Sequence, residues 1–294
     1  MNISIVIPNF NGEELLIKNL PSVIEAKKNK KNNILEIIVV DDASQDSSAK
    51  ILKEEFKGEV RVFSHTKNKG FAATVNTGVR MAKGNFVCLL NSDVIPSKNF
   101  LETMVEDFED KQVFGVSLHE KGFGYAKGKF LDGFIVHEGM PETGTVTETF
   151  WASGGSSVLR RETFMELKGL DEVLLPFYWE DLDLSYRAQK RGYKVLWDPR
   201  ANVVHHHEST YGKLNQKYVQ RMRERNHLLF IWKNLTSSRF MAKHIASLFR
   251  RILAHPGYLR IVFMALAKYG KLMERRRKEI KETIVSDEAI FAKF

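Results

Sequence analysis

Residues 37–44 read Ile-Ile-Val-Val-Asp-Asp-Ala-Ser, an unbroken apolar run that ends in two adjacent acids. Such a run is typical of a strand that is covered on both faces, as strands are in a parallel sheet. Amphipathic helical patterns separate it from comparable runs on either side of it. The repeated strand-helix order predicts an α/β fold with a mostly parallel central sheet flanked by helices. The other apolar runs are Ile3–Ile7, Val60–Phe63, Phe86–Leu90 and Val113–Val116, and the helical patterns cover about residues 13–26, 47–56, 71–82 and 98–108.

The regular alternation stops at residue 120. Residues 120–149 contain six glycines and have weak periodicity, which predicts loops and short strands. Order returns at Phe150, with a helix expected over about residues 181–191 and short strands near Val195 and Val203. From about Lys217 the pattern is helical. We therefore expect a catalytic domain over 1–215 and a basic helical extension over 216–294.

The composition is that of a globular protein, with 43% hydrophobic and 28% charged residues among 294. The single cysteine, Cys88, lies in an apolar run and indicates a small core residue in a reducing compartment. The N-terminus has the pattern of a strand rather than that of a signal peptide. No run of 18 apolar residues occurs in the sequence, which argues against a spanning helix. We expect a cytoplasmic protein.

Basic residues are concentrated in the last third of the chain. Residues 1–209 hold 26 Lys and Arg against 30 Asp and Glu, whereas residues 210–294 hold 19 against 6. This basic end carries an apolar helical stripe, Ile245, Leu248, Phe249, Ile252 and Leu253. A second amphipathic stretch follows the break at Pro256-Gly257. The basic excess indicates an acidic partner, which is membrane lipid, nucleic acid or a polyanionic substrate, and the apolar stripe suits a membrane interface. Packing on the catalytic domain, or pairing with another subunit of a homo-oligomer, is the alternative.

Polar residues at the ends of the predicted strands are the candidates for chemistry. Asp41 and Asp42 end the second strand at the carboxyl edge of the sheet, where open α/β sheets bind ligands. They could accept hydrogen bonds from a base and from ribose hydroxyls, or Asp42 could only cap the next helix. Lys67-Asn68-Lys69-Gly70 opens a helix that also carries Asn76, and this arrangement favours a diphosphate or a simple N-terminal cap.

Three further segments carry acids or histidines. Asn91-Ser92-Asp93 ends a strand, and its carboxylate could hold a divalent cation against substrate phosphates or form an Asx turn. Trp179-Glu180-Asp181 begins a helix, where an acid is either a dipole partner or a general base for a sugar hydroxyl. His205-His206-His207 ends the last predicted strand and makes one metal ligand plausible.

In chain order these segments resemble family-2 inverting glycosyltransferases with the GT-A fold. The motifs are Val-Ile-Pro-x-x-Asn-Gly at 6–12, Val-Asp-Asp-x-Ser at 40–44, Asn-x-Gly at 68–70, Asn-Ser-Asp at 91–93, Glu-Asp-x-Asp-Leu-x-x-Arg at 180–187 and His205. The resemblance covers about residues 3–235 and is nearest to bacterial rhamnosyltransferase-like enzymes of cell-envelope polysaccharide biosynthesis. It implies a Rossmann-like GT-A domain followed here by a C-terminal α-helical extension.

The resemblance also implies roles for matching residues. Donor nucleotide binding is expected of Pro8, Asn9, Asn11, Asp41, Asp42, Lys69, Gly70, Asn76, Asn91 and Ser92. A divalent metal ion, Mg²⁺ or Mn²⁺, is expected at Asp93 and His205, with His207 as second choice. Because Asn91 stands where the family has the first acid of its metal motif, we expect metal binding that is weaker or that depends more on the diphosphate. Contacts with donor sugar or acceptor are expected from Gly154, Gly155, Trp179 and Glu180.

By the same resemblance Asp181 is the general base, with Asp183 next in line. The expected reaction inverts the anomeric carbon of a UDP- or dTDP-linked hexose or deoxyhexose. The acceptor would be a hydroxyl of a glycan or lipid-linked glycan at the cytoplasmic face of the membrane.

Three other classes fit the sequence less well. A dinucleotide-dependent oxidoreductase would carry Gly-x-Gly-x-x-Gly after the first strand, where this chain has Pro8-Asn9-Phe10-Asn11-Gly12. A histidine-based metal hydrolase needs clustered ligands, whereas the acids here are spread along the chain. A nucleic-acid binder needs a basic stripe or a recognition motif, and the first domain has neither.

Overall fold

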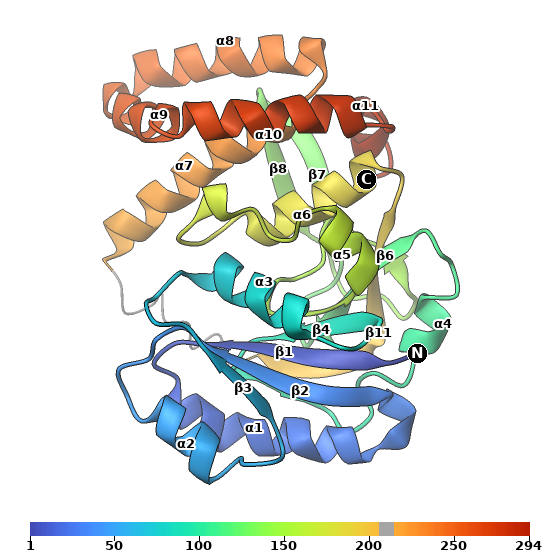
Figure 1. Ribbon diagram of the computed structural model, residues 1–294. Helices are drawn as coiled ribbons and strands as arrows, with labels where there is room; N and C mark the ends of the chain where they lie inside the picture. The colour runs from blue at the N-terminus through green and yellow to red at the C-terminus, as the bar shows by residue number, and fades with distance from the viewer. Residues whose placement is uncertain (206–214) are drawn as a thin grey trace.

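The computed structural model describes residues 1–205 and 215–294, and a nine-stranded sheet lies at its centre (Figure 1). The strands of this sheet are β1 (Ile3–Asn9), β2 (Ile34–Asp41), β3 (Arg61–Ser64), β4 (Phe86–Leu90), β5 (Val94–Pro96), β6 (Val113–Glu120), β9 (Thr147–Glu148), β10 (Ser156–Arg160) and β11 (Lys194–His205). Their order is β3-β2-β1-β4-β10-β6-β11-β5, with β9 paired to β11. The sheet with its flanking helices and the helices at the C-terminus agree with the predicted α/β fold and its helical extension.

The first half of the sheet is parallel, as the sequence predicts. β1 pairs in parallel with both β2 and β4, and β2 pairs in parallel with β3. The register places Asn9 opposite Asp41, so the polar ends of β1 and β2 lie side by side. The second half is mixed, because β10 runs antiparallel to both β4 and β6. That reversal brings the loop before β10 to the carboxyl end of β4.

Helices cover both faces of the sheet (Figure 1). One face packs against α1 (Glu13–Lys28) and α2 (Ser48–Glu54), which follow β1 and β2. The other packs against α3 (Phe71–Met81), α5 (Arg161–Glu166) and α6 (Glu180–Lys190). The continuous apolar strands are therefore buried on both sides, which is the physical reason for their composition.

One predicted helix is much shorter than expected. Of residues 98–108, only Met104–Asp107 form a helix, α4. The residues before it form successive turns, since the N–H groups of Phe100, Glu102 and Met104 each bond to the carbonyl three residues earlier. Asn32 also binds this segment by accepting the N–H of Leu101 and donating to the carbonyl of Lys98. These side-chain bonds compete with a regular helix.

Residues 120–149 hold a two-stranded antiparallel hairpin, as the glycine-rich sequence indicates. Its strands are β7 (Ala126–Leu131) and β8 (Phe134–Gly139), which form a sheet of their own. The turn uses Asp132 and Gly133, both at positive φ. The hairpin places His137 beside the start of α6, where its ring lies edge-on to Trp179 with centroids 5.8 Å apart.

The last third of the chain is helical, with α7 (Gln216–Asn234), α8 (Ser238–Ala254), α9 (Leu259–Leu266), α10 (Tyr269–Glu282) and α11 (Asp287–Phe291). The second predicted amphipathic stretch is divided at Lys268 into α9 and α10. Leu228–Ile231 of α7 share a buried cluster with Phe150 and Tyr186 of the preceding region. The described helices include none with the length and apolar character needed to span a bilayer.

Candidate active site

The ends of β1 and β2 form one hydrogen-bonded unit. Asn9 donates its side-chain N–H to Asp41 Oδ1 at 2.9 Å, and the Ser44 hydroxyl donates to the same oxygen at 2.5 Å. Asn11 joins them through its N–H, which donates to the Ser44 hydroxyl at 2.9 Å. Asn9 and Asp41 are buried, whereas Pro8 is half-buried and Asn11 is exposed. The predicted nucleoside-binding residues thus lie together at the carboxyl edge of the sheet. Of these, Pro8 and Asn11 are accessible to a ligand, whereas Asn9 and Asp41 are buried.

Asp42 organises the start of α3. Its carboxylate accepts the N–H groups of Lys69 and Gly70 at 2.9 and 2.8 Å, and it contacts His65 Nδ1 at 2.6 Å. Gly70 has a φ of 85°, which favours glycine, and a Cβ there would lie 2.8 Å from Leu175 Cδ2. His65 was not predicted as a site residue. It directly follows β3, and this position at a strand end is the sequence feature that could have identified it.

Asn76 does not join these residues. Its amide is buried in the second turn of α3 and both of its polar atoms are bonded to the backbone of Leu170, each at 2.9 Å. Gly169 leaves room for it, since a Cβ there would lie 2.3 Å from Asn76 Oδ1. Asn76 therefore fastens α3 to the loop after α5.

Asn91, Ser92 and Asp93 leave the end of β4 beside the loop before β10. The N–H of Asn91 donates to the carbonyl of Gly155 at 2.8 Å, and a Cβ at Gly155 would lie only 2.7 Å from Asn91 Nδ2. Glycine at 155 therefore permits the close approach of the two loops. The buried Asn91 Oδ1 accepts no hydrogen bond from the part of the chain that the structure describes.

Asp93 and His205 meet as the sequence predicts, and Glu120 joins them. His205 Nε2 lies 3.1 Å from Asp93 Oδ1, and Nδ1 lies 3.0 Å from Glu120 Oε1. Burial lowers the pKa of His205, but the bonds to these two carboxylates outweigh it and raise the value to about 9. Glu120 was not predicted, although an acid at the end of β6 is the same kind of signal that identified Asp93.

These residues fit a divalent cation that is held partly by a diphosphate. Asp93 offers a carboxylate, His205 an imidazole nitrogen once a cation displaces its proton, and Asn91 the amide oxygen without a partner in the described residues. Among residues 1–205 and 215–294 no group of three or more His, Cys, Asp or Glu is arranged to hold a metal ion. Few protein ligands suffice for Mg²⁺, which keeps water and substrate phosphate oxygens, and such oxygen donors also suit Mn²⁺. His207, the second choice, lies outside the described residues.

Asp181 lies in the first turn of α6 and contacts the loop before β10. Its Oδ2 accepts the N–H of Gly154 at 3.0 Å, and a Cβ at Gly154 would lie 3.2 Å from the Cβ of Asp181. Burial raises the pKa of Asp181, and the N–H groups of Gly154 and Leu182 offset this only in part. A carboxylate with a raised pKa and a partly exposed side chain is suited to accept a proton.

Asp183 has a different environment. It is fully buried, its Oδ2 accepts Arg187 Nε at 2.8 Å, and its Oδ1 pairs with Lys233 Nζ at 2.6 Å. Both of its oxygens are neutralised by cations inside the protein. It is therefore no alternative base, and it stabilises the contact between α6 and α7.

Glu180 is the least satisfied acid of the site. It is buried, and its Oε2 has no hydrogen-bond partner in the described parts of the chain. Burial, followed by the neighbouring carboxylate of Asp181, raises the pKa of Glu180 to about 8. At neutral pH the carboxyl therefore carries a proton and can donate a hydrogen bond.

Aromatic side chains surround the head of α6. Trp179 stacks on His227 of α7 with ring centroids 4.2 Å apart, and His137 lies edge-on to Trp151 at 4.5 Å. Trp179 has a φ of 76°, which is strained for a side chain of this size. Of these four residues the sequence reasoning singled out only Trp179. Trp151, His137 and His227 come from separate segments without a motif.

The chain is similar to known proteins in sequence and in fold. The protein-family model described as Glycosyl transferase family 2 matches residues 4–167. The chain is 29% identical over 185 residues to the pre-mycofactocin glycosyltransferase of Mycobacterium tuberculosis, which covers 60% of this chain and 38% of the relative. It is 32% identical over 130 residues to glycosyltransferase GlyG of Streptococcus pneumoniae. That match covers 44% of this chain and 42% of the relative. The chain thus spans about two fifths of the length of these relatives.

Solved structures share the fold. GalNAc-T7 with UDP, GalNAc and Mn²⁺ superposes with a TM-score of 0.66 at 19% identity, over 88% of this chain and 57% of that one. The mannosyltransferase PcManGT of Pyrobaculum calidifontis, with GDP-Man and Mn²⁺, superposes with a TM-score of 0.57 at 16% identity. The match covers 96% of this chain and 83% of that one. TarS of S. aureus in complex with UDP superposes with a TM-score of 0.58 at 18% identity, over 96% of this chain and 89% of that one.

Proposed function

The chain belongs to glycosyl transferase family 2, and on that premise we propose that it is an inverting glycosyltransferase with Asp181 as its general base. The observation that carries the proposal is the position of Asp181. Its carboxylate is bonded to Gly154 in the loop whose next residue, Gly155, contacts Asn91. The proposed base and residues of the proposed cation site thus contact one loop, Gly154-Gly155.

In the proposed reaction Asp181 takes the proton of an acceptor hydroxyl. The oxygen forms a bond to the anomeric carbon of the donor sugar from the face opposite the leaving group. The bond between that carbon and the diphosphate breaks, its electron pair leaves with the nucleoside diphosphate, and the anomeric configuration inverts. Asp93 and His205 would hold a divalent cation, which supplies positive charge against the departing diphosphate.

Glu180 and the aromatic side chains would contact the sugars. A protonated Glu180 can donate to a sugar oxygen, and its unpartnered Oε2 leaves it hydrogen-bonding capacity. The Asn9, Asp41 and Asp42 edge and the Lys69-Gly70 turn would bind the nucleoside and the diphosphate. We propose a UDP- or dTDP-linked hexose or deoxyhexose as donor, and a glycan or lipid-linked glycan hydroxyl as acceptor.

A panel of nucleotide sugars tests this proposal. We expect UDP- or dTDP-sugars to raise the melting temperature and to be turned over with an acceptor, in the presence of Mg²⁺ or Mn²⁺ but not of EDTA. Asp93→Ala should lose most of the metal-dependent donor affinity, as measured by calorimetry. A protein stabilised only by GDP-sugars would contradict the donor class. Equal affinity with metal and with EDTA would contradict the cation site.

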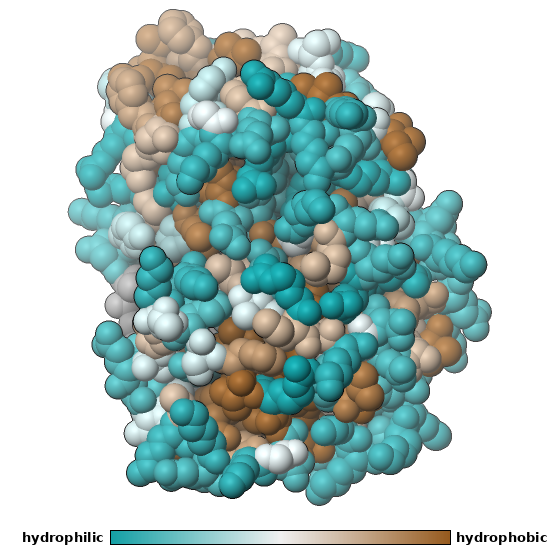
Figure 2. Space-filling model, in the orientation of Figure 1, coloured by the Kyte–Doolittle hydropathy of each residue, from teal (hydrophilic) through white to brown (hydrophobic). Residues whose placement is uncertain are grey.

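The C-terminal helices favour attachment to a membrane surface. α8 buries His244 and Ser247, whereas Ile245, Phe249 and Leu253 on another side are 61%, 61% and 66% exposed. Apolar residues gather over α8 and α9 at the upper left of Figure 2. An exposed apolar stripe on a basic helical region suits the boundary between lipid headgroups and acyl chains. We propose that these helices hold the enzyme on an anionic membrane at its cytoplasmic face.

A further inference from the structure

The chain enters α6 through two residues in a strained backbone conformation. Tyr178 and Trp179 have φ angles of 71° and 76°, a region that large side chains rarely occupy. Trp179 is the N-terminal cap of α6, but its side chain forms no capping hydrogen bond. The start of the helix that carries Asp181 is therefore not fixed by a local cap. Such strained conformations persist only where the surrounding structure holds them, and they cluster at active sites.

Asn226 of α7 holds this segment from the helical region. Its side chain is fully buried, and its amide nitrogen donates to the carbonyl of Phe177 at 2.8 Å and to that of Tyr178 at 3.1 Å. The same nitrogen also bonds to the carbonyl of Leu174. The carbonyl of Tyr178 and the N–H of Trp179 belong to one peptide group. Asn226 therefore fixes the orientation of the peptide through which the chain enters α6.

The two neighbours of Asn226 in the chain contact the same segment. Arg225 Nε donates to Asn226 Oδ1 at 3.0 Å, which orients the amide, and Arg225 NH2 donates to the carbonyl of Leu175. On the other side, the ring of His227 stacks on Trp179 with centroids 4.2 Å apart. Three consecutive residues of α7 thus bind the segment before α6 through its carbonyl groups and through one aromatic ring.

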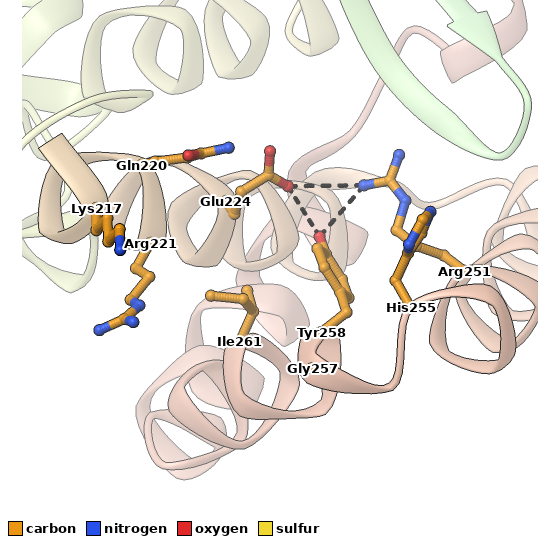
Figure 3. Close-up of a pocket in the computed structure, with 9 residues that line it drawn as sticks. All are labelled: Lys217, Gln220, Arg221, Glu224, Arg251, His255, Gly257, Tyr258 and Ile261. Carbon is orange, nitrogen blue, oxygen red and sulfur yellow. Dashed lines mark hydrogen bonds and ion pairs between the residues drawn. The ribbon is translucent and has the colours of Figure 1, made fainter.

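Contacts on another side of α7 keep this helix in place. The Tyr258 hydroxyl donates to Glu224 Oε2 at 3.0 Å, and Arg251 NH1 lies 3.6 Å from the same oxygen (Figure 3). The Arg251 guanidinium also lies over the ring of Phe134, 3.9 Å from its centroid. Glu224 and Asn226 are two residues apart in a helix and so point to roughly opposite sides. α7 is therefore held between the corner of α8 and α9 and the segment before α6.

We propose that Asn226 is a positioning residue for the reaction, which holds the strained turn before α6 so that Asp181 meets the N–H of Gly154. This inference rests on the role proposed for Asp181. Without the amide, the carbonyls of Phe177 and Tyr178 lose this partner and the turn is free to relax. The first turn of α6 then moves relative to the loop before β10. The helical region is by this inference part of the catalytic unit.

Asn226→Ala and Asn32→Ala form a matched pair of variants of the full chain. Asn32 is also a fully buried asparagine, and its amide nitrogen donates to the carbonyls of Ala26 and Lys98, each at 2.8 Å. It precedes the amino end of β2, whereas the candidate site lies at the carboxyl end. We expect similar decreases in melting temperature. Asn226→Ala should also lower kcat by about 10²-fold, because a misplacement of about 1 Å has an effect of that size, whereas Asn32→Ala should keep kcat.

The activity is measured as release of the nucleoside diphosphate from UDP-galactose, UDP-N-acetylglucosamine or dTDP-rhamnose, with water as the acceptor. This readout needs no identified glycan. Calorimetric dissociation constants of UDP and dTDP should change less than kcat in Asn226→Ala, because the proposed nucleoside edge lies on β1 and β2. A loss confined to kcat is the expected sign of a displaced base.

The pH dependence of kcat/KM separates positioning from lost stability. Burial raises the pKa of Asp181, and a displaced α6 lets water reach the carboxylate. In Asn226→Ala the acidic limb should therefore move to lower pH, toward the ordinary aspartate value of 3.8. The titratable neighbours of Asp181 are Glu180 on α6 and His137 on β8, and both are retained in the variant. Asn32→Ala should keep the wild-type limb.

The outcomes distinguish this inference from the proposed function. Asn226→Ser keeps one hydrogen-bond donor, so its kcat should lie between those of Asn226→Ala and the wild type, and it replaces the alanine variant if that chain does not fold. A wild-type kcat and acidic limb in the Asn226 variants, or equal losses of kcat in Asn226→Ala and Asn32→Ala, overturn the positioning role and leave Asp181 as the base. Full activity of Asp181→Asn, or no release of nucleotide by the wild type, overturns the proposed function and this inference with it.

Discussion

The sheet region and the C-terminal helices differ in how much apolar surface they leave exposed. The strands β1, β2 and β4 bury apolar side chains on both faces, and Ile38 of β2 is fully buried. In the helical region the salt bridge between Lys190 and Asp287 is fully buried, whereas Ile245 and Phe249 of α8 are mostly exposed. The sheet is thus stabilised chiefly by apolar burial. The helical region also buries an apolar cluster, but it adds a buried ion pair and presents apolar residues outside.

The head of α6 is where the two regions meet, since α6 packs under the sheet's second face and contacts both α7 and α11. Asp181 lies at this junction. A base that is effective there needs the burial that raises its pKa and the Gly154 N–H that orients it. The packing of the two regions therefore affects the pKa and the orientation of the proposed base. The expected effects of single substitutions follow, from the largest to the smallest.

Asp181→Asn should leave donor binding intact and lower transfer by about 10²–10⁴-fold, because no proton acceptor remains. In the wild type, kcat/KM should fall as the pH drops through a pKa above the ordinary aspartate value of 3.8, since the base must be ionised. Steady-state kinetics over pH, with Asp110→Asn as a surface control, measure both. Near-wild-type transfer by Asp181→Asn would refute the assignment.

Asp287→Ala tests the charged interior of the helical region. It removes the carboxylate that binds Lys190 Nζ and the Tyr186 hydroxyl, each at 2.7 Å, and leaves a buried cation without its partner. We expect a loss of about 3–5 kcal/mol in the free energy of unfolding, measured by denaturant titration. Glu282→Gln, in a half-exposed pair with Arg191, should cost less than about 1 kcal/mol. Similar small losses in both variants would mean that the buried pair does not hold α11 in place.

Glu180→Gln tests the acid at the junction. The folded chain keeps the Glu180 proton up to about pH 8, whereas an unfolded chain releases it near 4.5. The folded state therefore binds more protons between these values, and stability should decrease as the pH rises through them, by at most about 1.4 kcal/mol per pH unit. Glutamine, which does not ionise, should remove that contribution. Parallel unfolding curves of wild type and variant at pH 5 and pH 8 decide it, and an unchanged slope would disprove the raised pKa.

Ile245→Ala should give the smallest change in stability, within about 0.5 kcal/mol, because the side chain is already exposed. Ile38→Ala, the same substitution in β2, should cost about 2–5 kcal/mol. Thermal unfolding of the two variants measures the contrast directly. If Ile245→Ala costs as much as Ile38→Ala, the exposed stripe is buried in solution, and an oligomer interface would replace the membrane as its partner.

The elements and the edge of the site were predictable because their signals are local. Apolar runs identified β1, β2 and β4, and the acids that follow the second and third of these runs are Asp41, Asp42 and Asp93. Asp93 and His205 were expected to meet, and they do. The roles of these residues in binding and catalysis stay predictions. The boundary at residue 215 also stays one, and α7 shares a buried cluster with Phe150 and Tyr186 on the other side of it.

The sequence by itself determined the strand-helix alternation of the first 90 residues, the polar residues at the strand ends and the basic character of the last third. These follow from backbone geometry and from side-chain periodicity within short segments. Only the tertiary structure decided which partner each polar group receives. His205 meets Glu120 and Asp93 from 85 and 112 residues away, and Asp183 is separated from Asp181 by its burial between Arg187 and Lys233. Neither α8's outward apolar stripe nor the unpartnered oxygen of Glu180 follows from a local pattern, because burial depends on how distant segments pack.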